Sequence, residues 1–273
     1  MRDTTSRQHG FTLVELIMVI VIMGIIGGIV AVFMKGPIDA YFATARRAGL
    51  TDVVDTAVRR MTRDLHKALP NSILNANPQC IEFIPTKAGG RYRAAVDAFG
   101  NGDILDFTTA DASFDMFGAN GTISDQTIGA GDVIAVYNLG PGINDAYASP
   151  PNNNRAVVSS VGVGSLPNET KINIAAKQFP LASGSNRFHV IPANESVVAY
   201  VCSGGNLYRT PRAFTSATCP ATGAILASKV SSCNFVYNGS DLQRNGLVQL
   251  SLQLTDSGET VSLYDEVHVD NTP

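Results

Sequence analysis

The feature that most constrains this chain is an uninterrupted apolar segment near its N-terminus. From Leu16 to Met34 there is no charged residue, whereas from Lys35 onward charged and apolar residues are mixed. A helix rises about 1.5 Å per residue, so a segment of this length crosses the roughly 30 Å hydrocarbon core of a bilayer. The sequence therefore predicts a single membrane-spanning helix over residues 11–34.

The residues before this segment predict its orientation. The leader MRDTTSRQHG, residues 1–10, contains two arginines and one aspartate, and positively charged flanks tend to stay in the cytoplasm. A secretory signal peptide would have an apolar region of about 7–15 residues followed by a small-x-small cleavage site. Here the run is longer, and Gly10 precedes it. We therefore expect the helix to be retained and the rest of the chain to lie outside the cytoplasm.

The boundary between leader and helix carries a specific motif. The segment GFTLVE at residues 10–15 resembles the class III leader of type IV prepilins and type II secretion pseudopilins. The resemblance implies cleavage by a prepilin peptidase after Gly10, N-methylation of the new terminus at Phe11, and retention of the hydrophobic helix in the mature protein. The alternative is an uncleaved signal anchor in which the Gly-Phe junction and Glu15 occur by chance.

Glu15 is the one acidic residue at the start of this apolar helix. A carboxylate at the centre of a membrane costs about 2.5–3.5 kcal/mol, and less nearer an end, so it generally persists where it has a partner. The resemblance to pilins implies that Glu15 pairs with the N-terminal amine of Phe11 on the adjacent subunit and sets the axial register of the filament core. The alternative is that the carboxylate reaches the lipid headgroups.

The helix departs from the pattern of the resembled family in one respect. Many pilins carry a proline within the apolar half, whereas the first proline here is Pro37, and Gly24, Gly27 and Gly28 lie in the apolar half instead. Glycine weakens a helix by about 0.8–1.0 kcal/mol relative to alanine and permits close helix packing. Whether this helix melts on assembly stays open.

Beyond the apolar run, residues 35–69 predict an amphipathic continuation of the same helix. Apolar residues recur at steps of three and four; they are Leu50, Val54, Ala57, Val58, Met61, Leu65 and Ala68. This stripe requires a surface to pack against. Pro70 cannot continue the hydrogen-bond ladder, so we expect the helix to end near Leu69.

The remaining residues, 70–273, predict a β-rich head. Short β-branched and aromatic runs are separated by Gly, Asn, Asp and Pro; the predicted strands are Cys80–Pro85, Asp103–Thr108, Asp132–Tyr137, Ala156–Val161, Arg187–Ile191, Val197–Cys202, Asn234–Tyr237, Leu247–Thr255 and Glu259–Val269. The last two are joined by Asp256-Ser257-Gly258, which predicts an antiparallel hairpin. The region from about Gly89 to Arg155 is interpreted as long loops or an inserted subregion.

The head also resembles part of the same family. The closing stretch, residues 226–247 and on to 267–273, resembles larger minor pilins and J-type pseudopilins. Together with residues 187–190 and the predicted strand that carries Cys202, it is most similar to minor pilins of mannose-sensitive haemagglutinin (MSHA) pili. The implied fold is α+β, the type IV pilin fold. In that fold a long N-terminal helix, comprising membrane span and amphipathic stalk, packs on a head with an antiparallel sheet.

Four cysteines, Cys80, Cys202, Cys219 and Cys233, all lie beyond the apolar segment. An extracytoplasmic compartment can be oxidising, so disulfides are the expected use. Three pairings are possible, and we favour Cys202 with Cys219 and Cys80 with Cys233. Zinc ligation is the weaker alternative, because no two cysteines are two to four residues apart and no histidine pair completes a site.

No motif in the sequence predicts catalysis. There is no G-x-S-x-G elbow, P-loop or H-E-x-x-H motif, and His66, His189 and His268 are scattered. Asp97, Asn101, Asp103 and Asp106 could supply oxygen ligands to calcium, but their spacing is not that of an EF-hand and turn formation is the better interpretation. A net charge of −3 provides no basic surface for nucleic acid. We expect no enzyme activity, no cofactor and no metal.

The sequence therefore favours a minor pilin that initiates or caps a filament by helix packing. It would be a single-pass inner-membrane protein with its head in the periplasm. It could also be incorporated in the extracellular pilus. Expected partners are other pilins and minor pilins, the prepilin peptidase and the inner-membrane assembly platform. The alternatives are a J-type pseudopilin of a type II secretion system and a membrane-anchored periplasmic binding protein or enzyme that never polymerises.

Overall fold

The computed structural model describes residues 10–123, 125–142, 144–239 and 245–273. The chain divides into two compact units, one ending at Gly49 and the other beginning at Leu50. One helix, α1 (Leu13–Leu65), contributes residues to both units. The strands belong to the second unit; they are β1 (Leu74–Asn77), β2 (Cys80–Phe83), β3 (Ala88–Arg91), β4 (Asp111–Phe117), β5 (Val133–Val136), β6 (Arg155–Val163), β7 (Glu169–Lys177), β8 (Arg187–Ile191), β9 (Val197–Ser203), β10 (Asn206–Arg212), β11 (Ala224–Ser228), β12 (Val230–Asn238), β13 (Asn245–Asp256) and β14 (Glu259–Asp270).

Within the first unit, α1 is apolar and exposed along its length. Every residue from Leu13 to Met34 is exposed in the single chain. Among the described residues, α1 is the one helix long and apolar enough to cross a membrane, with a mean hydropathy of 3.0 over its most apolar stretch. An unaccompanied helix of this composition cannot remain in water, so it requires lipid or other helices around it.

Within the second unit, the apolar stripe of α1 is buried as predicted. Leu50, Val54, Ala57, Val58, Met61 and Leu65 are the buried residues of the helix. They form one core with apolar side chains of β2, β9, β10, β12, β13 and β14. Asp55 and Arg59, on another face, form an exposed ion pair at 2.6 Å.

The helix ends at Leu65, earlier than the predicted end near Leu69. The chain leaves the helix through a tighter turn, in which the N–H of Ala68 donates to the carbonyl of Leu65. Ala68 then forms an antiparallel bridge with Pro85, and the N–H of Leu69 donates to the carbonyl of Ile84. Pairing with the segment after β2 therefore ends the helix before Pro70 does.

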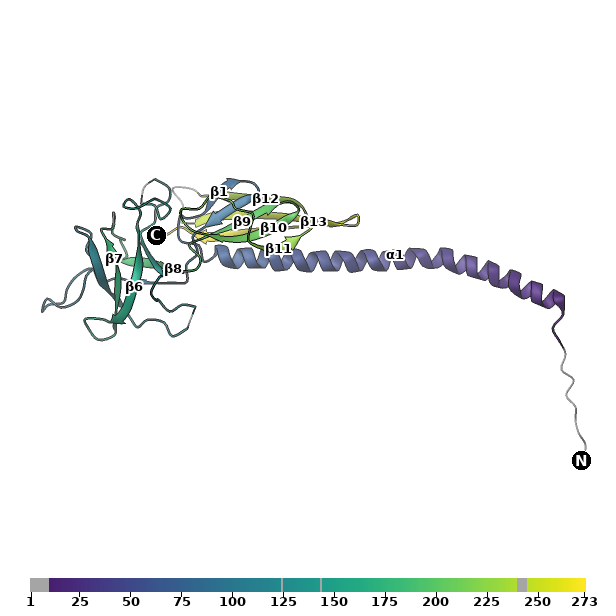
Figure 1. Ribbon diagram of the computed structural model, residues 1–273, viewed down its shortest axis with the longest axis horizontal. Helices are drawn as coiled ribbons and strands as arrows, with labels where there is room; N and C mark the ends of the chain where they lie inside the picture. The colour runs from purple at the N-terminus through teal and green to yellow at the C-terminus, as the bar shows by residue number, and fades with distance from the viewer. Residues whose placement is uncertain (1–9, 124, 143, 240–244) are drawn as a thin grey trace, which may run out of the picture. The chain divides into compact units, whose positions relative to one another are not determined.

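Two antiparallel sheets contribute to the core around α1. One has five strands in the order β1-β2-β9-β10-β11, and the other has three in the order β12-β13-β14. Figure 1 shows β9, β10, β11 and β13 grouped beside the C-terminal part of α1. The expected α+β class, with a long N-terminal helix packed on an antiparallel sheet, is confirmed.

The hairpin predicted at Asp256-Ser257-Gly258 is present. β13 and β14 pair without a register shift from Asp256↔Glu259 to Asn245↔Asp270. Ser257 and Gly258 both have positive φ, at 49° and 84°, as a two-residue type I′ turn requires. Alternation along β13 buries Val248, Leu250, Leu252 and Leu254 as a strip on one face.

A second lobe, residues 88–191, is inserted between β2 and β9, which are adjacent in the five-stranded sheet. Its six strands follow the order β3-β8-β5-β6-β7-β4, all antiparallel. An antiparallel bridge between Tyr92, directly after β3, and Met116 of β4 joins the two ends of this order. The two ends of the strand order therefore meet, as in a small barrel, and we call this part the barrel lobe. Figure 1 labels its strands β6, β7 and β8.

The barrel lobe has a core of its own. Its largest fully buried side chains are aromatic and aliphatic; among them are Tyr92, Phe114, Ile134, Ile172, Phe179, Phe188 and Val190. The region expected to be loops or an inserted subregion is thus the first part of an inserted lobe, and it contains more strand than predicted.

Most predicted strands are observed, with small shifts at their ends. They correspond to β2, β5, β6, β8, β9, β12, β13 and β14. The strand predicted over Asp103–Thr108 is wrong, because carboxylates take the backbone donors there: the N–H of Asp103 donates to Asp115 and that of Asp106 to Asp111. Six observed strands had no prediction; they are β1, β3, β4, β7, β10 and β11.

Gly90 on β3 allows the barrel lobe to close. A Cβ at this position would lie 2.7 Å from Sδ of Met116 and 2.8 Å from Cζ of Phe188. Both neighbours are buried, at 5% and 1% exposure, so neither side chain has space to move away. A residue larger than glycine would therefore push β3 away from β4 and β8.

We expect Gly90→Val to destabilise the protein by about 1–3 kcal/mol, the usual cost of overpacking a core. The measurement is denaturant or thermal unfolding of the purified chain in detergent, followed by circular dichroism. Gly162→Val on β6 is the matched control, because a Cβ there would have no heavy atom of the other described residues, beyond its two chain neighbours, within 4 Å. Equal unfolding midpoints for the two variants would contradict this account of barrel closure.

Candidate functional site

The predicted processing residues, Gly10 and Phe11, lie directly before the first turn of α1 and are exposed. Helix α1 begins at Leu13, so Thr12 is the residue that precedes it. Cleavage after Gly10 would leave a new amine one residue before Thr12. The structure thus places Gly10, Phe11 and Glu15 within one short segment at the helix start.

Thr12 and Glu15 form a reciprocal capping pair. The N–H of Glu15 donates to Oγ1 of Thr12 at 3.3 Å. In return, Oε2 of Glu15 accepts from the N–H of Thr12 at 3.0 Å and from its hydroxyl at 3.2 Å. This is the capping box, which satisfies free donors at a helix N-terminus, where negative charge is also favoured by the helix dipole.

The capping box changes the interpretation of Glu15 in the single chain. The carboxylate already has donors from Thr12 through Oε2, while Oε1 has no hydrogen-bond partner in the described part of the chain. One oxygen is therefore committed to the helix start, and the other is available to a further donor. Thr12 was missed as a functional residue, although T-x-x-E before an apolar run is a recognisable signal.

The glycines of the apolar half leave open space on the helix surface. A Cβ at Gly24, Gly27 or Gly28 would meet no atom of the described residues within 4 Å, apart from the adjoining backbone of the helix itself. Gly27 and Gly28 are neighbours and so lie on different sides of α1. Small residues at such positions let a second helix approach closely.

All four cysteines are in disulfides, but the favoured pairing is wrong. Cys80 is bonded to Cys219 with an S–S distance of 2.04 Å, and Cys202 is bonded to Cys233 with an S–S distance of 2.07 Å. Both bonds lie beyond Leu50, in the second unit.

The register between β2 and β9 explains this correction. Cys80 is directly opposite Val201, so Cys202, the next residue on β9, points to the other face of the sheet. That face contains the core around α1, where Cys233 lies. Cys80 packs on the opposite face with Val201 and Cys219, so it cannot reach Cys233.

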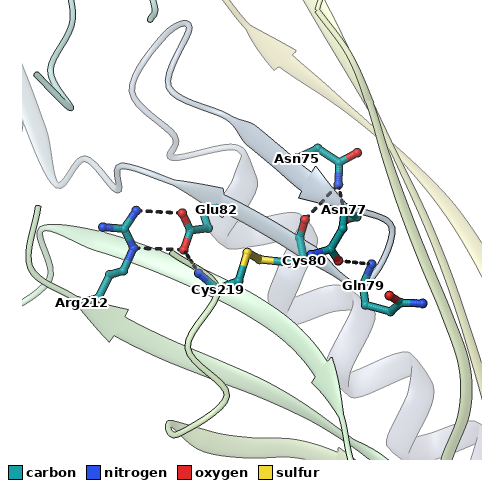
Figure 2. Close-up of a disulfide and its surroundings, with 7 residues drawn as sticks. All are labelled: Asn75, Asn77, Gln79, Cys80, Glu82, Arg212 and Cys219. Atoms are coloured by element: carbon teal, nitrogen blue, oxygen red, sulfur yellow. Dashed lines mark hydrogen bonds and ion pairs between the residues drawn. A yellow bond between two sulfur atoms is a disulfide. The ribbon is translucent and has the colours of Figure 1, made fainter. Parts of the chain in front are cut away.

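A buried ion pair accompanies the Cys80–Cys219 disulfide (Figure 2). Glu82 of β2 points to the same face as Cys80 and is 1% exposed. Its carboxylate accepts from Nε and Nη2 of Arg212 at 3.0 and 2.7 Å. It also accepts from the N–H of Cys219 at 2.6 Å. The buried charge is thus paired and hydrogen-bonded, as a low-dielectric site requires.

This cluster stabilises structure and leaves no open ligand position. In the described residues, Cys80, Glu82 and Cys219 are the one group of three or more His, Cys, Asp or Glu residues whose potential ligand atoms lie within 4.8 Å of one another. Thiolates bind metals, whereas these two sulfurs are joined to each other. Both oxygens of Glu82 already face donors of Arg212. Nearby, burial and then the charge of Glu82 raise the pKa of the Tyr147 hydroxyl well above its usual value.

A cleft of about 760 Å³ lies where the barrel lobe meets the end of α1. His66 and His189, far apart in sequence, both line it. The other charged groups are largely paired: Lys87 with Asp132 at 2.7 Å, and Arg209 with Glu195 and Asp64. Burial, followed by the charge of Arg187, lowers the pKa of His189, and its Nε2 has no partner in the described residues.

The candidate calcium residues form a turn, as interpreted. The carboxylate of Asp97 accepts from the backbone of Phe99 and from the backbone and side chain of Asn101. Asp103 instead accepts from Ser113 and pairs with Lys171 at 2.9 Å. These interactions direct the carboxylates to different partners rather than to a common centre.

Comparison with known proteins identifies the N-terminal segment alone. Residues 5–31 match the prokaryotic N-terminal methylation motif. No curated protein and no solved structure matches the chain. The motif covers the capped helix start and most of the apolar run. It indicates a type IV pilin-like, membrane-anchored protein of pilus or pseudopilus assembly, whose processing involves a prepilin peptidase and whose partners are pilins.

Proposed function

We propose that this chain is a minor pilin that takes part in assembly of a type IV pilus, initiating or capping the filament. The observation that carries the proposal is the methylation motif at residues 5–31, which leads directly into the capped start of an apolar helix. The finer resemblance of the head is to MshO, a minor pilin of MSHA pili. In this proposal the function of the present chain is structural rather than catalytic.

Processing would create the interaction that drives assembly. Cleavage after Gly10 frees the amine of Phe11, which is then N-methylated. Glu15 pairs with this amine on a neighbouring subunit and sets the axial register. Oε1 of Glu15, which has no hydrogen-bond partner among the described residues, supports this role, because the carboxylate can accept a hydrogen bond from an incoming ammonium group without giving up its bonds to Thr12.

The protein would reside in the inner membrane, with residues 70–273 in the periplasm and later in the extracellular filament. Two disulfides in that part of the chain support this location, because such bonds persist in oxidising compartments. Its partners are other pilins and minor pilins, the prepilin peptidase and the inner-membrane assembly platform.

Two other functions retain support. A J-type pseudopilin of a type II secretion system would use the same physical parts, and neighbouring genes for a pilus or a secretion system would separate the two. The cleft of about 760 Å³ favours a membrane-anchored periplasmic binding protein, since its volume lies in the range of small-molecule sites. That function requires neither a processed N-terminus nor Glu15.

We expect mass spectrometry of the mature protein to find Phe11 as the first residue, with a methylated amine. In cells without the prepilin peptidase, the chain should keep its leader, residues 1–10. Recovery of an unprocessed, unmethylated chain from cells with an active peptidase would exclude the pilin and pseudopilin functions and leave the anchored binding protein.

Substitution of Glu15 separates helix capping from charge pairing. Glu15→Gln keeps a capping-box residue at this position but removes the negative charge, so we expect both Glu15→Gln and Glu15→Ala to reduce piliation at least tenfold. Membrane insertion should be unchanged in both variants. The measurement is quantitation of sheared filaments by immunoblot, with cell membranes as the loading control. Normal piliation with Glu15→Gln would show that capping alone is required.

Thr12 provides the complementary test. Thr12→Val keeps the shape of the side chain but removes the hydroxyl, which costs a helix about 0.5–2 kcal/mol at this position. We expect fraying of the first turn, measured by hydrogen exchange of Leu13 to Leu16 in micelles. Thr12→Ser retains the hydroxyl and should behave as the native chain. Identical exchange in Thr12→Val and Thr12→Ser would contradict the capping box.

A further inference from the structure

The outer edge of β14 is unlike the two edges of the five-stranded sheet around α1. β1 and β11, which end the five-stranded sheet, are four and five residues long, and both contain a register shift. β14 is 12 residues long, contains no proline, and pairs with β13 in unbroken register. Short length and bulges are the usual means by which a protein prevents an edge from accepting another strand. β14 has neither.

The turn geometry identifies which backbone groups face outward. In a two-residue hairpin, the residues that flank the turn, Asp256 and Glu259, exchange both hydrogen bonds, and alternate residues do so along the strand. The residues between them direct their N–H and C=O groups away from β13; these are Thr260, Ser262, Tyr264, Glu266, His268 and Asp270. All six have exposed side chains. Their outward backbone groups have no partner in the described part of the chain.

The opposite face of β14 holds the strand in place. Val267 and Val269 are buried in the core around α1. Asp265 accepts a hydrogen bond from the hydroxyl of Thr62 on the helix at 2.8 Å. The open edge therefore belongs to a fixed strand, which reduces the ordering cost for an added strand.

Charge indicates what the edge accepts. β14 carries Glu259, Asp265, Glu266 and Asp270 and no lysine or arginine. Glu266 receives hydrogen bonds from Gln249 and Tyr264, both neutral. Like charges on paired strands are destabilising and opposite charges stabilising. A second copy of β14 would bring four more acidic residues, so a basic segment fits better.

We infer that the open edge of β14 binds an extended segment of another polypeptide that carries lysine or arginine, which adds to the sheet as a fourth strand beside β14. The backbone groups of the six outward residues supply the hydrogen bonds, and the acidic side chains supply the preference for a basic segment. This binding requires neither processing at Gly10 nor a filament, so its test is independent of the proposed function.

The test uses the purified full chain in detergent and a fluorescein-labelled peptide, KVKTKVKTK, followed by fluorescence anisotropy. We expect saturable binding that weakens with salt, and at least tenfold weaker binding of the matched peptide with glutamate in place of lysine. Hydrogen exchange should slow on peptide addition at the outward residues and not at their neighbours. Equal binding of the two peptides would overturn the charge preference.

Ser262→Pro tests the backbone contact. The N–H at position 262 faces outward, so proline there removes no bond to β13, and proline is tolerated at such edge positions. We expect at least tenfold weaker peptide binding with an unchanged unfolding midpoint, whereas the matched Ser262→Val, which keeps the N–H, should bind as the native chain. Unchanged binding to a folded Ser262→Pro variant would overturn the inference.

A test on the native chain covers the case in which the proline variant fails to fold. Two forms of the lysine peptide are compared, each N-methylated on a different set of alternate amides. Because alternate amides of an extended peptide face opposite edges, each form has one edge blocked and one edge open. We expect one form to lose binding and the other to retain it; equal affinities would overturn strand addition. A concentration-dependent dimer that Ser262→Pro abolishes would overturn the choice of a foreign basic segment as the occupant.

Discussion

The burial of one face of α1, from Leu50 to Leu65, is the contact on which the head depends. Apolar side chains of both sheets, from Ile81 on β2 to Val269 on β14, meet on this face. Each such side chain contributes about 1.5–3 kcal/mol when fully buried. The helix therefore brings together segments that are separated in sequence by nearly the whole length of the head. The two sheets share a core on its surface that neither sheet would have alone.

The local patterns of the sequence were sufficient for the elements around this core. The charge-free run and the stripe at steps of three and four predicted α1, the alternation of apolar and polar residues predicted β13, and the link Asp256-Ser257-Gly258 predicted its hairpin with β14. These elements have one clear apolar face and well-defined turn residues, so local physics determines them. The end of α1 was less predictable, because pairing of Ala68 with Pro85 depends on a segment that follows β2.

The barrel lobe was harder to predict for the same reason. β3 is the segment AGGR, with two glycines and no strand signal of its own; its strand character comes from pairing with β8, and Gly90 is there to make room for Met116 and Phe188. β4 carries two aspartates, which a propensity argument counts against a strand. Asp115 is buried nevertheless, since the backbone of Asp103 and Ser165 donates to it.

At the candidate sites, residue types predicted which kinds of side chain are used, but they did not predict which side chains meet in the fold. The processing motif and Glu15 could be identified from residue types alone, and Thr12 could have been. The disulfide pairing depended on which face of β9 each cysteine occupies, which follows from the register of Cys80 with Val201 and from nothing local. His66 and His189 met in one cleft only because the barrel lobe returns to the end of α1.

The insertion point of the barrel lobe has a consequence for how such a chain diversifies. Phe83 and Val198 are paired neighbours in the five-stranded sheet, and the N–H of Lys87 donates to the carbonyl of Val190 where the lobe begins and ends. The barrel lobe therefore leaves and rejoins the five-stranded sheet at one place, as a long hairpin loop would. The outer loops of the lobe can therefore change in length while the strands beside α1 keep their alignment, whereas its base is tied to the scaffold, because Nδ2 of Asn138 donates to the carbonyl of Pro70.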